Sequence, residues 1–491
     1  MILLLKRHAW LGFAIAVLFT LLGQRGLNEP DEGRYAEIAR EMTVNGDWLV
    51  PHMNGIPHFQ KPPILYWLTA LSLRNFGHSE WAARLPSALA ALGVVILSFL
   101  IGLRLFKERD RAVMTAIVLT TMGGFFAMGR LLTPDMTMTF WITASITAAL
   151  YGQRWLFFIL MGLGFLTKGP MALVVPVCAI VGWEWRSAAA ERLRLPWWRG
   201  IVITLAISLS WFVILSLRDS QLFDYFWRYE LVQRFGSHTH GRARPFWFFM
   251  LVLPLALLPW LFMLPVKRAC QSLRSNGIKP WHGLLLGWIL VPLVILSISG
   301  SKLPTYVLPL LPAFALGIAS GLPSLRRTWW IAGCAALCFV ALDFMVAQNN
   351  DLLGAQASSR DLARALHRLE PDADSAILFA CETRTEGLAY YMAHLLHITR
   401  GESDMVGESM SEQQQILYRN ARDCVRKLTR GSPAHGIVRT SQYEKMFDPN
   451  HWRVIARSGA YSLVANHEEL ARKTLAEQLA GRGRDRESNP A

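Results

Sequence analysis

The chain has 491 residues, 53% of them apolar, and contains 19 Trp and 25 Phe, which is a composition typical of membrane proteins. Its formal net charge of +15 would suit a nucleic-acid-binding protein, but the Lys and Arg residues are scattered in short clusters between apolar runs. We therefore expect membrane lipids around the chain and no nucleic acid as a partner, and we interpret the cations as signals of membrane topology.

Apolar runs long enough to cross a bilayer recur up to residue 347. The first run follows Lys6 and Arg7 as in a signal peptide, but it lacks a small-residue cleavage site and more runs come after it, so we interpret it as a retained anchor. We predict eleven transmembrane helices, over residues 8–24, 84–104, 112–129, 134–151, 155–167, 169–185, 200–217, 246–266, 281–299, 303–321 and 328–347.

The basic residues in the short connections predict the orientation of these helices, because Lys and Arg favour the cytoplasmic side. Alternate connections carry the basic clusters, and the opposite ones carry the single cations Arg130, Lys168 and Lys302. With the N-terminus inside, residues 24–83, residues 218–245 and the chain after Gln348 lie outside. In a Gram-negative bacterium this orientation predicts a multi-pass inner-membrane protein with its outer segments in the periplasm.

The outer segment 24–83 predicts two interfacial helices. In YAEIAREM, residues 35–42, apolar side chains recur at helical spacing, while Glu37, Arg40 and Glu41 cover another face, as in a helix lying along the membrane surface. In KPPILYWLTALSL, residues 61–73, two prolines stand where a helix could start, and the apolar run after them is too short for a span.

After Gln348 the composition becomes that of a soluble domain. We expect a small α/β fold here, with strands over residues 375–380, 436–440 and 453–465 and helices over 359–369 and 411–428. The sequence thus predicts a transmembrane domain over 1–347, a soluble periplasmic α/β domain over 348–465, and a polar tail over 466–491.

Carboxylates and cations gather in the predicted outer connections. NEPDEGRYAEIAREM contains the adjacent carboxylates Asp31 and Glu32, followed by Arg34, and RLLTPDM contains Arg130 and Asp135. Two separated connections therefore deliver a carboxylate to the same side of the membrane, where charge held near lipid is costly. Because the predicted inner connections are mainly basic, this mixture favours a polar site over charges that merely decorate loop ends.

Further polar residues are predicted on the same side. They are Gln60, Lys61, Lys168, Lys302, Tyr306 and His240. Two carboxylates, several cations and a tyrosine at a lipid–water boundary suit an amphiphile with a phosphate head group, because Arg and Lys neutralise phosphate oxygens. Structural alternatives stay open for three of these residues, since Lys168 and Lys302 could snorkel and His240 could be an ordinary loop residue.

Five of these stretches resemble, in order along roughly the first 320 residues, the motifs of one known superfamily. They are NEPDEGRYAEIAREM, HFQKPPILYW, RLLTPDMTMTFW, FLTKGP and SKLPTYVLP. The chain resembles the GT-C membrane glycosyltransferases related to aminoarabinose lipid A transferase and, more distantly, to protein O-mannosyltransferases. The resemblance implies a mainly α, polytopic fold, for which thirteen spans would be expected where we count eleven. It also implies an inverting transferase that takes a sugar from a polyprenyl phosphate on the outer face.

The resemblance also implies roles for single residues. Asp31 matches the catalytic carboxylate of the first loop, Asp135 the acidic residue of the second loop, and Arg34, Lys61 and Tyr306 the groups near the donor phosphate. To these we add Arg130 and Lys302 as cations for the phosphate, and Glu32, Tyr35, Gln60, Lys168 and His240 as further candidates for the site. Aminoarabinose transferases commonly carry Glu before the KPP lysine, where this chain has the poor metal ligand Gln60. No cofactor is therefore assigned, and Gln60 disfavours a divalent ion shared with His240 without excluding one.

We predict a glycosyltransferase that moves a sugar, best matched by 4-amino-4-deoxy-L-arabinose, from a polyprenyl phosphate to lipid A or another envelope lipid or glycan. Two alternatives stay open. Transfer to protein hydroxyls would need a base, because an alcohol acceptor must lose a proton. A transporter of lipid-linked sugar would need no chemistry, and it is expected to show charge facing both sides at the midplane and often internal repeats, which this sequence does not display.

Overall fold

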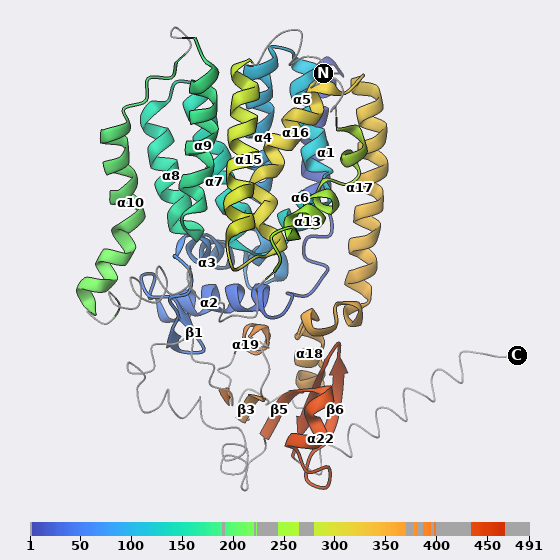
Figure 1. The fold of residues 1–491 in the computed structure, drawn as a ribbon. Helices are drawn as coiled ribbons and strands as arrows, with labels where there is room; N and C mark the ends of the chain where they lie inside the picture. Colours follow the sequence, from blue (N-terminus) through green and yellow to red (C-terminus); the bar gives the residue numbers. More distant parts are fainter. Residues whose placement is uncertain are drawn as a thin grey trace, which may run out of the picture. The chain divides into compact units, whose positions relative to one another are not determined.

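A computed structural model (Figure 1) describes residues 2–188, 192–219, 222, 244–264, 279–369, 377–381, 386–393, 397–398 and 434–466. Its contacts divide the chain into two units. Unit 1 comprises Met1–Leu22, Lys61–Ser72 and Trp81–Asp343, and unit 2 comprises Gly23–Gln60, Leu73–Glu80 and Phe344–Ala491. The first outer segment therefore groups mostly with the C-terminal region, while the predicted domain boundary at residue 347 stays a prediction.

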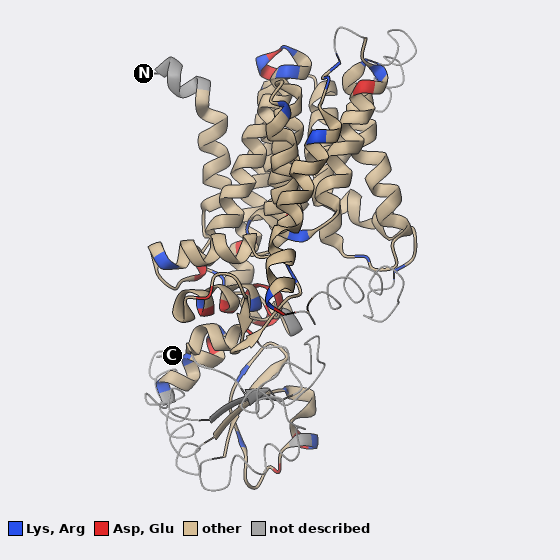
Figure 2. Ribbon diagram, turned by 90° about the vertical axis from the view of Figure 1, so that its left-hand side faces the viewer, with Lys and Arg blue, Asp and Glu red and all other residues tan. Residues whose placement is uncertain are grey.

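Unit 1 is a bundle of apolar helices whose core is formed by buried Leu, Ile, Val, Ala and aromatic side chains. Figure 1 shows its long helices running side by side, and Figure 2 shows that charged residues are rare along them and gather near their ends. The helices are α1 (Ile2–Phe19), α4 (Glu80–Phe106), α5 (Arg109–Thr120), α6 (Gly123–Gly129), α7 (Pro134–Leu150), α8 (Arg154–Lys168), α9 (Met171–Arg186), α10 (Trp197–Arg218), α13 (Phe248–Leu257), η3 (Trp260–Met263), α15 (Pro280–Ile298), η4 (Pro304–Leu310), α16 (Leu311–Gly321) and α17 (Leu325–Gln348).

The described helices identify a multi-pass membrane protein, but the predicted count of eleven spans is not confirmed. Five described helical segments are long and apolar enough to cross a membrane, and a bent pair adds a sixth. The predicted spans 134–151, 155–167 and 169–185 are helical, but α7, α8 and α9 have only 17, 15 and 16 residues. A helix rises about 1.5 Å per residue, so such lengths fall short of a bilayer core of about 30 Å.

The predicted single span 112–129 is wrong as a straight helix, because α5 and α6 meet at 67°. The Gly123 N–H, which opens α6, donates to the Leu258 carbonyl at 2.8 Å. At the same bend the Thr121 hydroxyl donates to the Ile117 carbonyl at 2.7 Å and accepts from the Trp260 indole N–H at 3.1 Å. Hydrogen bonds outside the helical ladder therefore explain the break.

Two helices of unit 1 approach each other through glycines. Gly182 of α9 packs on the backbone of Gly283 in α15, and Gly287, one turn further along α15, packs on the backbone of Cys178. A Cβ atom on any of these glycines would collide with the facing backbone. Such small-residue contacts are a common way for membrane helices to associate.

Unit 2 contains the helix predicted at 35–42, as α2 (Asp31–Asn45), but the helix does not present a solvated charged face. Glu37, Arg40 and Glu41 are all buried. Arg40 forms two hydrogen bonds of 2.7 Å to the Glu37 carboxylate, and Glu41 accepts N–H groups of Asn54 and Gly55, in the turn between β1 (His52–Met53) and β2 (Ile56–Pro57). The prediction that this charged face is solvated is therefore wrong, because its charged side chains pair inside unit 2.

The second predicted interfacial helix is present as α3 (Ile64–Phe76), which contributes residues to both units. The rest of unit 2 comprises η5 (Asn350–Gln356), α18 (Arg360–Leu369), β3 (Ile377–Cys381), α19 (Gly387–Met392), β4 (His397–Ile398), β5 (Ala434–Arg439), η7 (Thr440–Gln442), α22 (Tyr443–Met446), β6 (Arg453–Ser458) and β7 (Tyr461–Ala465).

Besides the β1-β2 hairpin, the described strands of unit 2 form one five-stranded sheet in the order β4-β3-β5-β7-β6. β3 runs parallel to β4 and β5, whereas β7 runs antiparallel to β5 and β6. The three predicted strand regions and the helix at 359–369 are confirmed, with 453–465 forming a hairpin around Gly459, which has a φ of 55°. The helix predicted at 411–428 and nearly all of the tail at 466–491 lie outside the described residues.

Candidate active site

The predicted site residues fall in both units, and within each unit the structure brings some of them together. Unit 2 holds Asp31, Glu32, Arg34, Tyr35 and Gln60, and unit 1 holds Lys61, Arg130, Asp135, Lys168, Lys302 and Tyr306. His240 lies outside the described residues. The groups formed are Asp31–Arg34–Gln60 in unit 2 and Asp135–Lys168–Tyr306 in unit 1.

The group in unit 2 lies at the start of α2. Asp31 and Glu32 occupy the first helical turn, where the helix dipole favours negative charge. Asp31 forms an ion pair with Arg34, and the Asp31 side chain is 60% exposed whereas that of Arg34 is 13% exposed. Arg34 Nη1 donates to Gln60 Oε1 at 3.5 Å, and its guanidinium carbon lies 5.6 Å from the centre of the Tyr35 ring. An open carboxylate beside a shielded guanidinium can bind hydroxyl, amino and phosphate groups.

Glu32 has different surroundings from its neighbour Asp31. Its carboxylate is buried, accepts the Asn28 N–H at 3.0 Å, and lies 3.5 Å from Arg25 Nη1 in an ion pair. Both partners belong to the segment before α2. The contacts of Glu32 therefore fix the entry into the helix, and the exposed carboxylate of the two is Asp31.

The group in unit 1 is built from three elements. Pro134 and Asp135 open α7, Lys168 ends α8, and Tyr306 lies in η4. Lys168 forms an ion pair with Asp135, with side-chain exposures of 15% and 6%, and its Nζ lies 5.1 Å from the centre of the Tyr306 ring. A carboxylate at the start of a helix and an ammonium group at the end of a helix both interact favourably with the helix dipoles. The structure thus joins two of the predicted motifs, TPDM and TKGP, through their charged residues.

Lys302 is buried, and its ammonium group donates to the carbonyls of Ser299, at 2.5 Å, and Arg244, at 3.0 Å. Both acceptors are neutral, and no carboxylate in the described part of the chain forms an ion pair with the Lys302 ammonium group. A desolvated ammonium of this kind favours an anionic partner. Lys61 is half-buried and directly precedes the prolines that lead into α3.

Arg130 is held inside unit 1. Its Nη1 donates to the carbonyls of Val17 and Leu18, each at 3.1 Å, and its Nη2 forms an ion pair of 2.9 Å with Asp343 of α17. These contacts tie the end of α1 to α17. They describe a structural arginine, and the predicted contact of Arg130 with a phosphate stays a prediction.

The donor set at Asp31 does not fit a divalent cation. Gln60 offers an amide oxygen that already accepts from Arg34, and Asp31 is paired with the same guanidinium. A cation between these groups would repel a metal ion, and hard divalent ions prefer several carboxylate or carbonyl oxygens. Among the described residues, no three His, Cys, Asp or Glu side chains cluster at metal-site spacing.

Three acidic residues with few or no solvent contacts were not predicted as site candidates from the sequence: Glu29 and Glu41, which are buried, and Asp343, which is partly buried. Burial first, and then Glu386, raises the pKa of the Glu29 carboxyl to about 8. Burial and the neighbouring Glu37 raise the pKa of Glu41 to about 7. Asp343 could have been recognised from the sequence, because an acidic residue inside an apolar helix marks a paired or functional group. Glu29 carried no such signal, because its partners lie more than 300 residues away along the chain.

Comparisons with known proteins agree on one class of membrane glycosyltransferase. Residues 21–226 match the family model described as dolichyl-phosphate-mannose-protein mannosyltransferase. The chain is 33% identical over 319 residues to the undecaprenyl phosphate-alpha-4-amino-4-deoxy-L-arabinose arabinosyl transferase of Serratia proteamaculans, and 34% identical over 320 residues to that of Photorhabdus laumondii. These matches cover 63% and 62% of this chain and 57% of each relative, so the chain matches little more than half the length of these relatives.

The fold extends the similarity to most of the chain. The crystal structure of ArnT from Cupriavidus metallidurans bound to undecaprenyl phosphate superposes with a TM-score of 0.76 at 24% identity, covering 94% of this chain and 98% of that one. The archaeal oligosaccharyltransferase AglB from Archaeoglobus fulgidus gives a TM-score of 0.51 at 12% identity, covering 94% of this chain and 74% of that one. At these identities the structural matches establish a shared fold.

Proposed function

We propose that this chain, a member of the GT-C superfamily of membrane glycosyltransferases, transfers 4-amino-4-deoxy-L-arabinose from undecaprenyl phosphate to a phosphate of lipid A. The reaction takes place at the periplasmic face of the bacterial inner membrane. The proposal rests chiefly on the similarity to relatives named for this arabinosyl transfer, which extends over 319 residues. The family-model match over residues 21–226 spans the motifs that carry Asp31, Asp135 and Lys168.

The described geometry supports this reaction class. Each unit presents a carboxylate paired with a cation, Asp31 with Arg34 and Asp135 with Lys168, and Lys302 adds an ammonium without an acidic partner among the described residues. Carboxylates bind the hydroxyl and amino groups of a sugar, and cations bind the phosphate of its lipid carrier. A lipid-linked amino sugar carries all of these groups.

The proposed transfer is a direct displacement with inversion. An oxygen of the acceptor phosphate attacks the anomeric carbon and forms the new C–O bond, while the bond from that carbon to the donor phosphate breaks. The departing undecaprenyl phosphate keeps the electron pair, and Arg34, Lys61 and Lys302 stabilise the negative charge that it gains. Tyr306 lies beside that phosphate. Asp31 and Asp135 orient the sugar and the acceptor.

A phosphate acceptor is already anionic at neutral pH, so this transfer needs no strong base. It also needs no divalent ion in our proposal, because the donor set around Gln60 does not suit one. The absence of a base requirement separates it from transfer to a protein hydroxyl, whose oxygen must lose a proton as the bond forms.

The test is a transfer assay with the purified full chain in detergent. Undecaprenyl phosphate carrying labelled aminoarabinose is the donor, and lipid A is the acceptor. We expect equal amounts of free undecaprenyl phosphate and of lipid A heavier by one aminoarabinose residue. Labelled donor that stays intact under all conditions would overturn the proposal.

A second candidate is transfer to protein hydroxyls, which the matching family model for residues 21–226 favours by its name. In the same assay, with unmodified periplasmic protein in place of lipid A, that activity would yield labelled polypeptide. We expect none, and label on protein but not on lipid A would reverse the order of the two candidates.

A further inference from the structure

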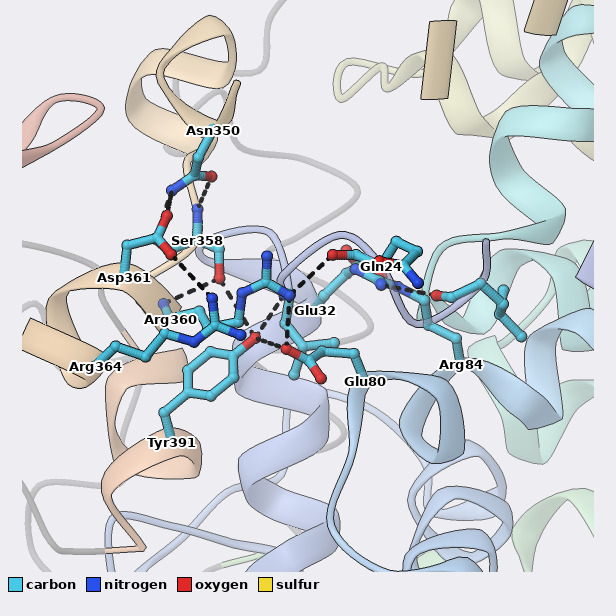
Figure 3. Close-up of polar contacts among 12 residues, drawn as sticks. Gln24, Glu32, Glu80, Arg84, Asn350, Ser358, Arg360, Asp361, Arg364 and Tyr391 are labelled. Carbon is cyan, nitrogen blue, oxygen red and sulfur yellow. Dashed lines mark hydrogen bonds and ion pairs between the residues drawn. The ribbon is translucent and has the colours of Figure 1, made fainter. Parts of the chain in front are cut away.

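The C-terminal region of the chain forms hydrogen bonds with residues 24–29, the segment that leads into α2. The C-terminal residues that form them are Ser359, Arg360, Gly387 and Tyr391, and we call them the clasp. Arg360 Nη1 donates to the Gln24 carbonyl at 2.9 Å, and the Tyr391 hydroxyl accepts the Leu27 N–H at 2.8 Å. All of these residues belong to unit 2. Figure 3 shows Arg360 and Tyr391 converging on the same region from α18 and α19.

Glu80 joins the two larger members of the clasp. Its Oε1 lies 3.2 Å from Arg360 Nη1 and accepts from the Tyr391 hydroxyl at 3.3 Å. Both side chains are thereby fixed in the orientation in which they reach the segment 24–27. The clasp is therefore a connected network and not a set of independent surface contacts.

Glu29 is the residue of this segment that the clasp holds most fully. Its carboxyl group is buried and accepts both the Ser359 hydroxyl and, at 3.0 Å, the Gly387 N–H. Glu29 stands two residues before Asp31, the first residue of α2. A buried group with specific partners fixes its backbone, so these contacts fix the origin of the helix.

Gly33 extends the same contact into α2 itself. A Cβ atom built on Gly33 would come within 2.5 Å of the Gly387 Cα and 2.6 Å of its backbone nitrogen. The two backbones meet at a distance that only glycine permits. Pro30, which precedes the helix, provides no side-chain cap, so these tertiary contacts act together with the local contacts of Glu32 to fix the start of α2.

We propose that Glu29 is a positioning residue which, through the clasp, sets the place of Asp31 and Arg34. The proposal rests on the function proposed above, and it gives the C-terminal region a part in building the active site. Asp31 and Arg34 stand on the first turn of α2, so a shift of that turn moves both at once. Misplacement of reacting groups by about 1 Å can cost about a hundredfold in rate.

The decisive variant is Gly33→Ala. Alanine is the better helix former, so α2 itself is not weakened, but its methyl group forces α2 and α19 apart. The matched control is Gly12→Ala in α1, where a Cβ would meet nothing within 4 Å. We expect turnover to fall at least about tenfold in Gly33→Ala and to stay at the wild-type level in Gly12→Ala.

A second readout does not depend on activity. Amide hydrogen exchange across residues 31–36 reports whether the start of α2 has loosened, and the melting temperature in detergent reports global folding. We expect faster exchange in Gly33→Ala with a melting temperature within a few degrees of wild type. Ser359→Ala removes one hydroxyl donor without any steric strain, and it is expected to show the same two effects more weakly.

Glu29 itself is tested by a conservative pair. Glu29→Gln keeps a carbonyl oxygen for the Gly387 N–H, whereas Glu29→Leu keeps no acceptor, so turnover should fall much more in the leucine variant. Faster exchange of α2 with normal turnover, or unchanged exchange in both Gly33→Ala and Ser359→Ala, would overturn the proposal. If the wild-type chain transfers no sugar, the proposed function fails, while the exchange experiment still decides whether the clasp holds α2.

Discussion

Lys168 at the end of α8 and Asp135 at the start of α7 form an ion pair in which both side chains are largely buried. The sequence distance between them is 33 residues, and Tyr306 covers the ammonium group from a third element. A buried pair of this kind gives little net stability, but removal of one partner leaves an uncompensated charge. The pair can therefore be used to separate a structural role from a role in the reaction.

We expect Lys168→Met to lower the free energy of unfolding by about 3–5 kcal/mol, because Asp135 then stays buried without its partner. The double variant Asp135→Asn with Lys168→Met should regain most of this loss. Its turnover should nevertheless remain at least about a hundredfold below wild type, since the carboxylate is gone. Unfolding in detergent and the transfer assay measure the two quantities. A double variant with restored turnover would show that the pair is only structural.

Asp31→Asn is expected to lower turnover at least about a hundredfold while the stability changes by less than about 0.5 kcal/mol, because the side chain is 60% exposed. The matched control is Glu108→Gln. Glu108 is also an exposed carboxylate, with 68% exposure, and it pairs with Arg111 three residues later. Turnover and melting temperature of both variants provide the comparison, and normal turnover in Asp31→Asn would remove its proposed role.

Most helix positions could be predicted from the sequence, because apolar runs of membrane length leave the backbone few alternatives. The strands at 377–381, 434–439 and 453–465 could be predicted for a similar reason, since their apolar content is bounded by turn residues. The bend between α5 and α6 could not. It depends on the Leu258 carbonyl, which lies 135 residues from Gly123 and leaves no mark on the local pattern.

The candidate site shows the same division. Motifs in order along the chain pointed to Asp31, Arg34, Asp135 and Lys168, and the structure pairs these residues within each unit. The burial of Glu37, Arg40 and Glu41 was not predicted. An amphipathic pattern shows that a helix has one polar face and one apolar face, but it does not show whether the polar face contacts solvent or protein. Partners supplied by the hairpin at 52–57 decide that.

Chelation of divalent ions is expected to leave transfer unchanged within about twofold, since Gln60 and Asp31 are engaged by Arg34 and offer a poor donor set. The assay is run with and without excess EDTA. In a Gln60→Glu variant the second carboxylate could favour a metal ion, so this variant is the positive control for metal-dependent activity. A wild-type chain inactivated by EDTA and rescued by a divalent salt would contradict this expectation.

Arg130 offers a test of its predicted contact with the donor phosphate. Asp343→Asn removes the charge that balances Arg130 and should lower stability by about 3 kcal/mol without a change in donor KM. Arg130→Gln should, in addition, raise donor KM about tenfold, because a charge-assisted hydrogen bond to phosphate is lost. Steady-state kinetics at fixed acceptor measure KM. Equal donor KM in the two variants would leave Arg130 with a structural role alone.

The buried carboxyl of Glu41 predicts a pH dependence of stability. Its pKa is raised to about 7 from an ordinary value of 4.5, by burial first and then by Glu37, while the N–H groups of Gly55 and Asn54 and the Arg40 guanidinium oppose this rise. Between pH 4.5 and pH 7, the Glu41 carboxyl is therefore protonated in the folded state and ionised in the unfolded state. The contribution of Glu41 to stability is full below about pH 4.5 and is lost as pH rises through 7.

Glu41→Gln removes this titration and keeps an oxygen that can accept one of the two N–H groups. We therefore expect the melting temperature of the variant, relative to wild type, to increase between pH 5 and pH 8, since wild type loses stability over that range and the neutral amide does not. Glu108→Gln, at an exposed position, should show no such trend. A difference between Glu41→Gln and wild type that stays constant from pH 5 to pH 8 would mean that Glu41 is ionised throughout, with the turn at Asn54 and Gly55 stabilising its charge.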